Sequence, residues 1–171
     1  VFSSGNTAPN THNTFGALTL SGQSVVLNDA TFIYDLGTAV SLNSDDTPNF
    51  IPTQKTGDLF KISNSTNISL TNSQFNFKGS LDKGSYLLVD ANSSINLGGG
   101  TLSNQLSASY NGNLLTHTLS PRGLLFDWQF NTHEAVNSQI WLSITGRNSL
   151  TMKWDDQTTS WTRDQDWTSV Q

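Results

Sequence analysis

Val25-Val26-Leu27-Asn28-Asp29-Ala30-Thr31-Phe32-Ile33-Tyr34 holds two short apolar pairs separated by turn-forming residues, and its spacing returns further along the chain. Ile68-Ser69-Leu70-Thr71-Asn72-Ser73-Gln74-Phe75-Asn76-Phe77 repeats the apolar spacing of two, then five, then two. A weaker third copy runs from Ile95 to Leu102. Apolar residues two apart share one face of a strand, and the Asn, Asp, Thr and Gly residues between the pairs turn the chain. The pattern therefore predicts strand, corner, strand.

Stacked copies of this unit predict an all-β fold. One copy cannot bury its apolar face alone, whereas copies laid strand on strand share a core. We therefore expect a short right-handed β-solenoid with a C-terminal hairpin cap, whose arms are residues 124–130 and 138–144. The copies are unevenly spaced, so a β-sandwich with similar hairpins stays open as the alternative fold.

Length and composition narrow the class of protein. The chain has 171 residues, which predicts a single domain over 1–171. Within it, the composition predicts a loose N-terminal arm over 1–14 and a Trp-rich tail over 148–171. Its net charge of −5 argues against nucleic-acid binding, which needs a basic surface. No run is apolar enough for a transmembrane helix, so we expect no membrane insertion by this segment. No cysteine is present for disulfides.

Two further stretches predict the centre and the periphery of the fold. The continuous apolar run Tyr86-Leu87-Leu88-Val89 predicts a strand covered on both faces. Residues 43–56 are rich in Asn, Asp, Ser and Pro, which predicts a long exposed loop and a candidate binding site. Asp45 and Asp46 are its candidate contact residues.

Several motifs carry a likeness to a known family. They are Leu18-Thr19-Leu20-Ser21-Gly22, Phe32-Ile33-Tyr34-Asp35-Leu36-Gly37, Gly57-Asp58-Leu59-Phe60-Lys61-Ile62, Lys83-Gly84-Ser85-Tyr86-Leu87-Leu88-Val89, and Asn148-Ser149-Leu150-Thr151-Met152-Lys153-Trp154 leading to Trp161 and Trp167. With these motifs the chain resembles the passenger region of bacterial autotransporters, especially the autotransporter-associated β-strand repeat proteins. The resemblance implies a β-helical fold and secretion or display at the bacterial cell surface, associated with the outer membrane. It also implies that the Trp-rich tail opens a further repeat.

On this basis we expect a module for adhesion or for binding host glycoproteins of the mucin type, or their glycans. Trp154, Trp161 and Trp167 can stack on the apolar faces of sugar rings, although capping the end of the β-stack is the alternative role for them. No cofactor is expected. The three histidines lack metal-ligand spacing and the Asp pairs match no calcium loop, so no metal site is predicted. The sequence carries no signal for an oligomeric state.

Asp35 and Asp90 support an alternative hypothesis, a secreted aspartic-type endopeptidase that degrades host glycoproteins such as mucin. Each follows an apolar run and precedes a small turn, as in the catalytic loops of aspartic proteases. That chemistry needs two carboxylates close enough to share a proton. Leu36 stands where those loops have a hydroxyl residue, and Asn92 stands where they have Gly. The other interpretation is that both residues end strands by accepting turn hydrogen bonds.

Overall fold

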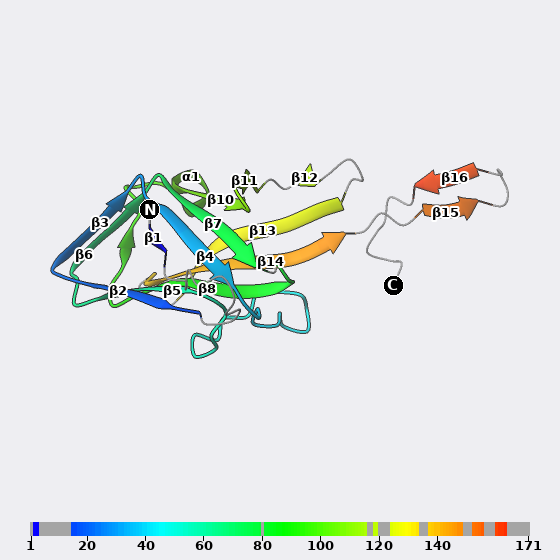
Figure 1. Cartoon of the computed structure of the whole chain (residues 1–171). Coiled ribbons are helices and arrows are strands. Elements are labelled where there is room, and N and C mark those ends of the chain that lie inside the picture. The colour runs from blue at the N-terminus through cyan, green and yellow to red at the C-terminus, as the bar shows by residue number, and fades with distance from the viewer. Residues whose placement is uncertain are drawn as a thin grey trace, which may run out of the picture. The chain divides into compact units, whose positions relative to one another are not determined.

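A computed structural model describes residues 2–3, 15–79, 81–115, 118–119, 124–133, 137–148, 152–155 and 160–163 (Figure 1). The chain divides into two compact units. The first unit consists of Val1–Leu115 and Trp128–Thr145, and the second consists of Thr116–Asp127 and Gly146–Gln171. The buried hydrophobic residues that the structure describes all belong to the first unit.

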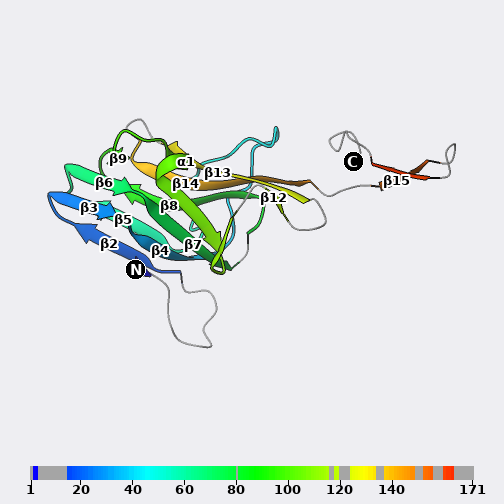
Figure 2. The same cartoon turned by 90° about the horizontal axis from the view of Figure 1, so that it is seen from above.

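The first unit is built from three successive passes of the chain, each of which gives one strand to each of three sheets. The first pass consists of β2 (Ala17–Ser21), β3 (Ser24–Asn28) and β4 (Thr31–Leu36). The second consists of β5 (Leu59–Ser63), β6 (Asn67–Thr71) and β7 (Ser73–Gly79). The third consists of β8 (Gly84–Ala91), β9 (Ile95–Asn96) and β10 (Leu106–Tyr110). Equivalent strands of successive passes pair in parallel, as β3 and β6 do in Figure 2.

The sheets have five strands (β1-β4-β7-β10-β11), six strands (β12-β13-β14-β8-β5-β2) and three strands (β3-β6-β9). The five- and six-stranded sheets mix parallel and antiparallel pairs. None of the sheets closes on itself. The predicted all-β class is therefore confirmed, and a sandwich-like arrangement of these sheets fits the same strand pairing.

The register explains why the apolar spacing repeats. Apolar residues of the first copy pair with apolar residues of the second: Val25 with Ile68, Leu27 with Leu70, Phe32 with Phe75 and Tyr34 with Phe77. The third copy keeps only its first half, since Ile95 pairs with Ile68. The expected continuation through Leu102 is wrong, because Leu102–Gln105 form a short helix (α1) and the pairing resumes at Leu106.

Aromatic side chains fill the core between the five- and six-stranded sheets. The rings of Phe32 and Phe75 stack with centroids 4.9 Å apart, and Phe32 lies 5.3 Å from Phe60 on the other sheet. The hydroxyl of Tyr34 donates to the carbonyl of Leu88 at 2.6 Å, which also joins the two sheets. Burial, together with the negative charge of Asp58, raises the pKa of Tyr34 well above its ordinary value. The phenol therefore stays a hydrogen-bond donor at neutral pH.

The predicted central strand and the predicted hairpin are both confirmed. β8 lies between β5 and β14 (Gln139–Asn148), and β13 (Leu124–His133) pairs with β14. Tyr86, Leu87 and Leu88 are all buried. The register between β8 and β14 shifts at Ile140 and Trp141, which changes the face on which the following side chains lie. β8 is thus a central strand with side chains buried on both faces.

Short strands complete the described chain. β1 (Phe2–Ser3) pairs in parallel with β4, and β11 (Asn113–Leu114) pairs antiparallel with β10. Within the second unit, β12 (Thr118–Leu119) pairs with the start of β13, and β15 (Met152–Asp155) pairs with β16 (Ser160–Arg163). No helix in the described part of the chain is long and apolar enough to cross a membrane. The expected loose arm, residues 1–14, lies outside the described residues, except for β1.

Candidate functional site

The segment between β4 and β5, residues 37–58, covers an apolar patch on the outer face of the six-stranded sheet. Leu59 and Lys61 lie on this face, because the alternate residues of β5 are buried in the core. The patch consists of Leu59, Leu87 and Trp141 on the sheet, and Val40 and Phe50 of the segment pack with them in one apolar cluster. The ring of Phe50 lies 5.2 Å from that of Trp141 and 4.7 Å from that of His133. Apolar burial thus anchors the segment to the sheet.

Backbone hydrogen bonds anchor the same segment at both ends. Val40 and Ser85 exchange two bonds of 2.9 Å, and the amide of Gly37 donates to the carbonyl of Thr56 at 2.8 Å. The hydroxyl of Thr56, a buried residue, accepts from the amide of Leu87 at 2.9 Å. Gly57 has a φ of 151°, and a Cβ there would lie 2.5 Å from the carbonyl oxygen of Asp35. A glycine is therefore needed where the segment returns to β5.

A groove opens where the segment leaves this apolar patch partly uncovered. Its volume is about 110 Å³. The lining residues are Phe15, Gly16, Ala17, Pro52, Gln54, Lys55, Thr56, Gly57, Leu59 and Leu87. Leu59 and Leu87 supply an apolar surface, Phe15 supplies an aromatic ring, and Gln54 and Lys55 supply polar groups. A few polar groups around an apolar surface are typical of small-molecule sites.

Phe15 is held in the groove by the close approach of its ring to Gly37 and by the hydrogen bonds of Gly16, which follows it. A Cβ at Gly37 would lie 2.5 Å from the Phe15 ring, so the ring occupies the space that a side chain there would fill. The amide of Gly16 donates to Oδ1 of Asp58 at 2.8 Å, and the amide of Leu59 donates to the carbonyl of Gly16 at 2.9 Å. Oδ2 of Asp58 accepts from the amide of Asp35 at 3.0 Å. The buried Asp58 carboxylate thus positions the residue that follows Phe15.

Besides Thr56, whose hydroxyl is bound to Leu87, two polar side chains line the groove, and they differ in what already binds them. Nε2 of Gln54 donates to the carbonyl of Ala39 at 3.2 Å, which fixes the amide and leaves Oε1 to accept from a ligand. Lys55 is exposed, and it forms no ion pair with a described residue. The groove therefore offers one oriented acceptor and one cation that forms no ion pair with a described residue.

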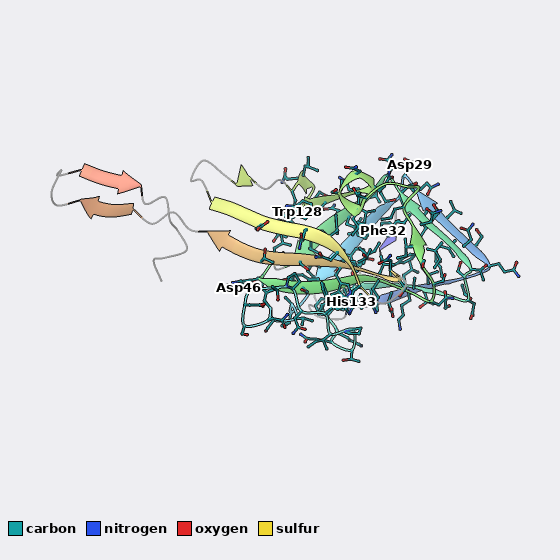
Figure 3. All side chains as sticks on the ribbon, turned by 180° about the vertical axis from the view of Figure 1, so that it is seen from behind. Asp29, Phe32, Asp46, Trp128 and His133 are labelled. Atoms are coloured by element: carbon teal, nitrogen blue, oxygen red, sulfur yellow. The ribbon has the colours of Figure 1, made fainter. Side chains whose placement is uncertain are left out.

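Asp45 and Asp46 lie in the tip of the predicted loop, which is exposed to solvent. The hydroxyl and the amide of Thr47 donate to Oδ1 of Asp45 at 2.6 and 3.1 Å, and these bonds lower the pKa of Asp45. Asp46 forms an ion pair with Lys83, with a distance of 2.7 Å from Nζ to Oδ1. Figure 3 shows Asp46 in the loop outside the sheets and Phe32 between them. Both carboxylates bind partners within the protein, and their contact with a ligand stays a prediction.

The predicted tryptophan contacts belong to the second unit. Trp154 and Trp161 are direct partners in the antiparallel register of β15 and β16. Trp167 lies outside the described residues, as do the side chains of the other two. A role for these tryptophans in stacking on sugars stays a prediction.

Asp35 and Asp90 lie on different sheets and have different partners. Asp35 is on β4, between buried Tyr34 and Leu36, and is the register partner of Lys78. Oδ1 of Asp90, on β8, accepts from Nε2 of Gln139 at 3.1 Å, and Oδ2 lies 3.9 Å from Nζ of Lys61. No described contact joins the two carboxylates, and a proton-sharing pair stays a prediction.

Metal binding and similarity to other proteins add no further site. Within the described ranges, no group of three or more His, Asp or Glu residues could hold a metal ion. His12 and His117 lie outside these ranges, and His133 stacks on Phe50. No family profile, curated protein or solved structure matches this chain. The function is therefore argued from the geometry of the site.

The sequence patterns do not point to Phe15 or to Asp58. Phe15 is an isolated aromatic residue at the end of a polar arm, and that isolation is the only signal it carries. Asp58 follows a glycine and precedes an apolar alternation, which is also typical of ordinary turn residues. Both positions become informative only when β2 lies beside β5.

Proposed function

We propose that this chain is a secreted or surface-exposed bacterial module that binds glycans of host glycoproteins such as mucins. We also propose that it is a short right-handed β-solenoid of the autotransporter passenger type. The parallel pairing of three passes in the same strand order supports the solenoid. Right-handed crossovers are the rule for parallel strands. The hairpin of β13 and β14 fits a cap, since its Phe130 ring lies 5.5 Å from Phe75 in the core.

The groove beside Phe15 is the observation that carries the proposed binding. A sugar ring has an apolar C–H face and a rim of hydroxyl groups, so it suits an aromatic ring beside an apolar surface with polar groups at its edge. The volume of about 110 Å³ is well below the roughly 300–1,000 Å³ of sites for drug-sized ligands. The groove therefore accommodates one ring, and the affinity for a single glycan should be on the order of 1 mM. Display of several copies would raise the avidity.

Phe15→Ala tests this proposal. We expect saturable binding of mucin oligosaccharides by the wild type, measured by NMR titration, and at least roughly tenfold weaker binding by the variant, because the ring face is lost. Val26→Ala is the matched control, since Val26 is 56% exposed on β3 of another sheet. It should leave binding unchanged. Thermal unfolding of both variants checks that the fold persists.

Two further results separate this proposal from its competitors. Binding that Trp161→Ala abolishes and Phe15→Ala leaves intact would move the site to the tryptophan tail. Cleavage of mucin that Asp35→Asn and Asp90→Asn both abolish would instead support the aspartic-type peptidase. The absence of saturable binding to any mucin glycan would contradict the proposed function itself.

A further inference from the structure

We infer that the groove selects sugars that carry a carboxylate over neutral sugars, with Lys55 as the residue that makes the distinction. This inference rests on the proposed glycan binding. Among the residues that the structure describes, Lys55 is the only charged side chain that lines the groove. In a chain with a net charge of −5, a groove whose described lining carries a single positive charge favours an anionic ligand by charge complementarity.

The carboxylates of Asp46, Asp58 and Asp90 all have described partners other than Lys55. Asp58 is 1% exposed, and both of its oxygens accept backbone amides. Asp46 is paired with Lys83, and Asp90 lies near Lys61. By contrast, Lys55 forms no ion pair within the described part of the chain. Charges more than about 8 Å away are largely screened at physiological ionic strength, so the nearest charge dominates at an exposed groove.

The side chain of Gln54 supports the binding of an acidic sugar through a second contact. Gln54 is fixed by its bond to Ala39, so Oε1 can accept a sugar hydroxyl while Lys55 donates to the carboxylate. Phe15 and Leu59 then face the apolar side of the ring. A neutral sugar keeps the ring contact and the hydroxyl bond but gains nothing from Lys55. Because an exposed ion pair is weak, the expected preference is only roughly two- to tenfold.

A matched pair of probes tests the inference. Methyl β-glucuronide and methyl β-glucoside differ only in the carboxylate, and sialyllactose with lactose forms a second pair that separates sialic acids from uronic acids. We expect the wild type to bind at least one acidic member roughly two- to tenfold more tightly by NMR titration, and added NaCl to reduce this preference. Lys55→Gln should remove the preference and keep the affinity for the neutral sugars.

Lys61→Gln is the control, because it removes the same charge from an exposed lysine of β5 that does not line the groove. It should keep the preference. Equal binding of acidic and neutral sugars by the wild type, or a preference that survives Lys55→Gln, would overturn the inference while the proposed glycan binding stands. If none of the four probes binds and mucin glycans also fail to bind, both this inference and the proposed glycan binding are contradicted. Mucin binding that is lost in Phe15→Ala but unchanged in Lys55→Gln overturns the inference alone.

Discussion

Two outer faces of the first unit differ in how their side chains are stabilised: one is polar and exposed to water, and the other is apolar and covered by a loop. On the three-stranded sheet, side chains bind one another from pass to pass in contact with water. Nδ2 of Asn67 donates to Oγ of Ser24 at 3.1 Å, and Oγ of Ser69 donates to Oδ1 of Asn28 at 3.2 Å. On the six-stranded sheet, the outer face is apolar around Trp141 and lies under residues 37–58.

The difference shows where this fold can form a binding site. A polar face needs no cover, because its groups bind each other and water. An apolar face needs a cover that keeps water away from it. The path of the covering loop is set by its own turns, so the loop does not cover the whole apolar patch. The groove beside Phe15 lies where that cover ends. The proposed binding site thus follows from apolar residues placed on an outer face.

The largest expected effect is a difference in the free energy of unfolding that is lost when one side chain on each face is truncated. Trp141→Ala removes a fully buried ring under the loop and should lower the free energy of unfolding by about 3–5 kcal/mol. Val26→Ala, on the exposed face of β3, should change it by less than about 0.5 kcal/mol. Urea unfolding followed by fluorescence or circular dichroism measures both. Similar losses in the two variants would contradict the view that only one outer face contributes apolar burial.

An intermediate effect is expected where the cover is hydrogen-bonded to the sheet. Thr56→Val keeps the shape of the side chain but removes the hydroxyl that accepts from Leu87. The buried amide is then unpaired, so the free energy of unfolding should fall by about 1–3 kcal/mol. Thr66→Val is the matched control, because the Thr66 hydroxyl donates to the carbonyl of Gln23 in an exposed turn. A loss in Thr66→Val as large as in Thr56→Val would show that burial does not set this cost.

Much of the fold was predictable, because strand periodicity carries it. The apolar spacing in residues 25–34 and 68–77 gave both the strands and their partners, since stacked passes place like residues in register. The uninterrupted apolar run at Tyr86 to Val89 likewise gave the strand that is buried on both faces. The third copy failed at Leu102, because a helical turn of four residues delays the next strand to Leu106. No apolar period marks such an insertion.

The candidate site was only half predictable. The turn-rich composition of residues 43–56 indicated a loop, and Gln54, Lys55 and Thr56 belong to the groove. The acidic pair in that loop was the more conspicuous signal, yet it binds partners at the tip. Phe15 comes from another pass and reaches the loop only because β2 pairs with β5. A bulge in the β8–β14 register accompanies the outward position of Leu87, and the sequence alone does not reveal it.

The smallest expected effect concerns acid, to which the tip of the loop over the covered face should respond. The Thr47 hydroxyl, and then the Thr47 amide, hold the pKa of Asp45 below its ordinary value. A lowered pKa in the folded state means that these bonds stabilise the tip above about pH 3.9 and are lost as the pH falls through the lower folded value. The side chains of Ser24, Asn67 and Ser69 do not ionise, so the polar ladder should not respond.

Amide chemical shifts and hydrogen exchange between pH 5 and pH 2 distinguish the two faces. The Thr47 amide should shift and exchange faster on acidification, whereas the Asn67 amide should not. Asp45→Asn keeps an acceptor oxygen without a titrating group, so its Thr47 amide should show no such transition. A transition in Thr47 that survives this substitution would assign the acid response to another group. Equal responses of Thr47 and Asn67 would instead indicate general unfolding, and the two faces would then not differ in their response to acid.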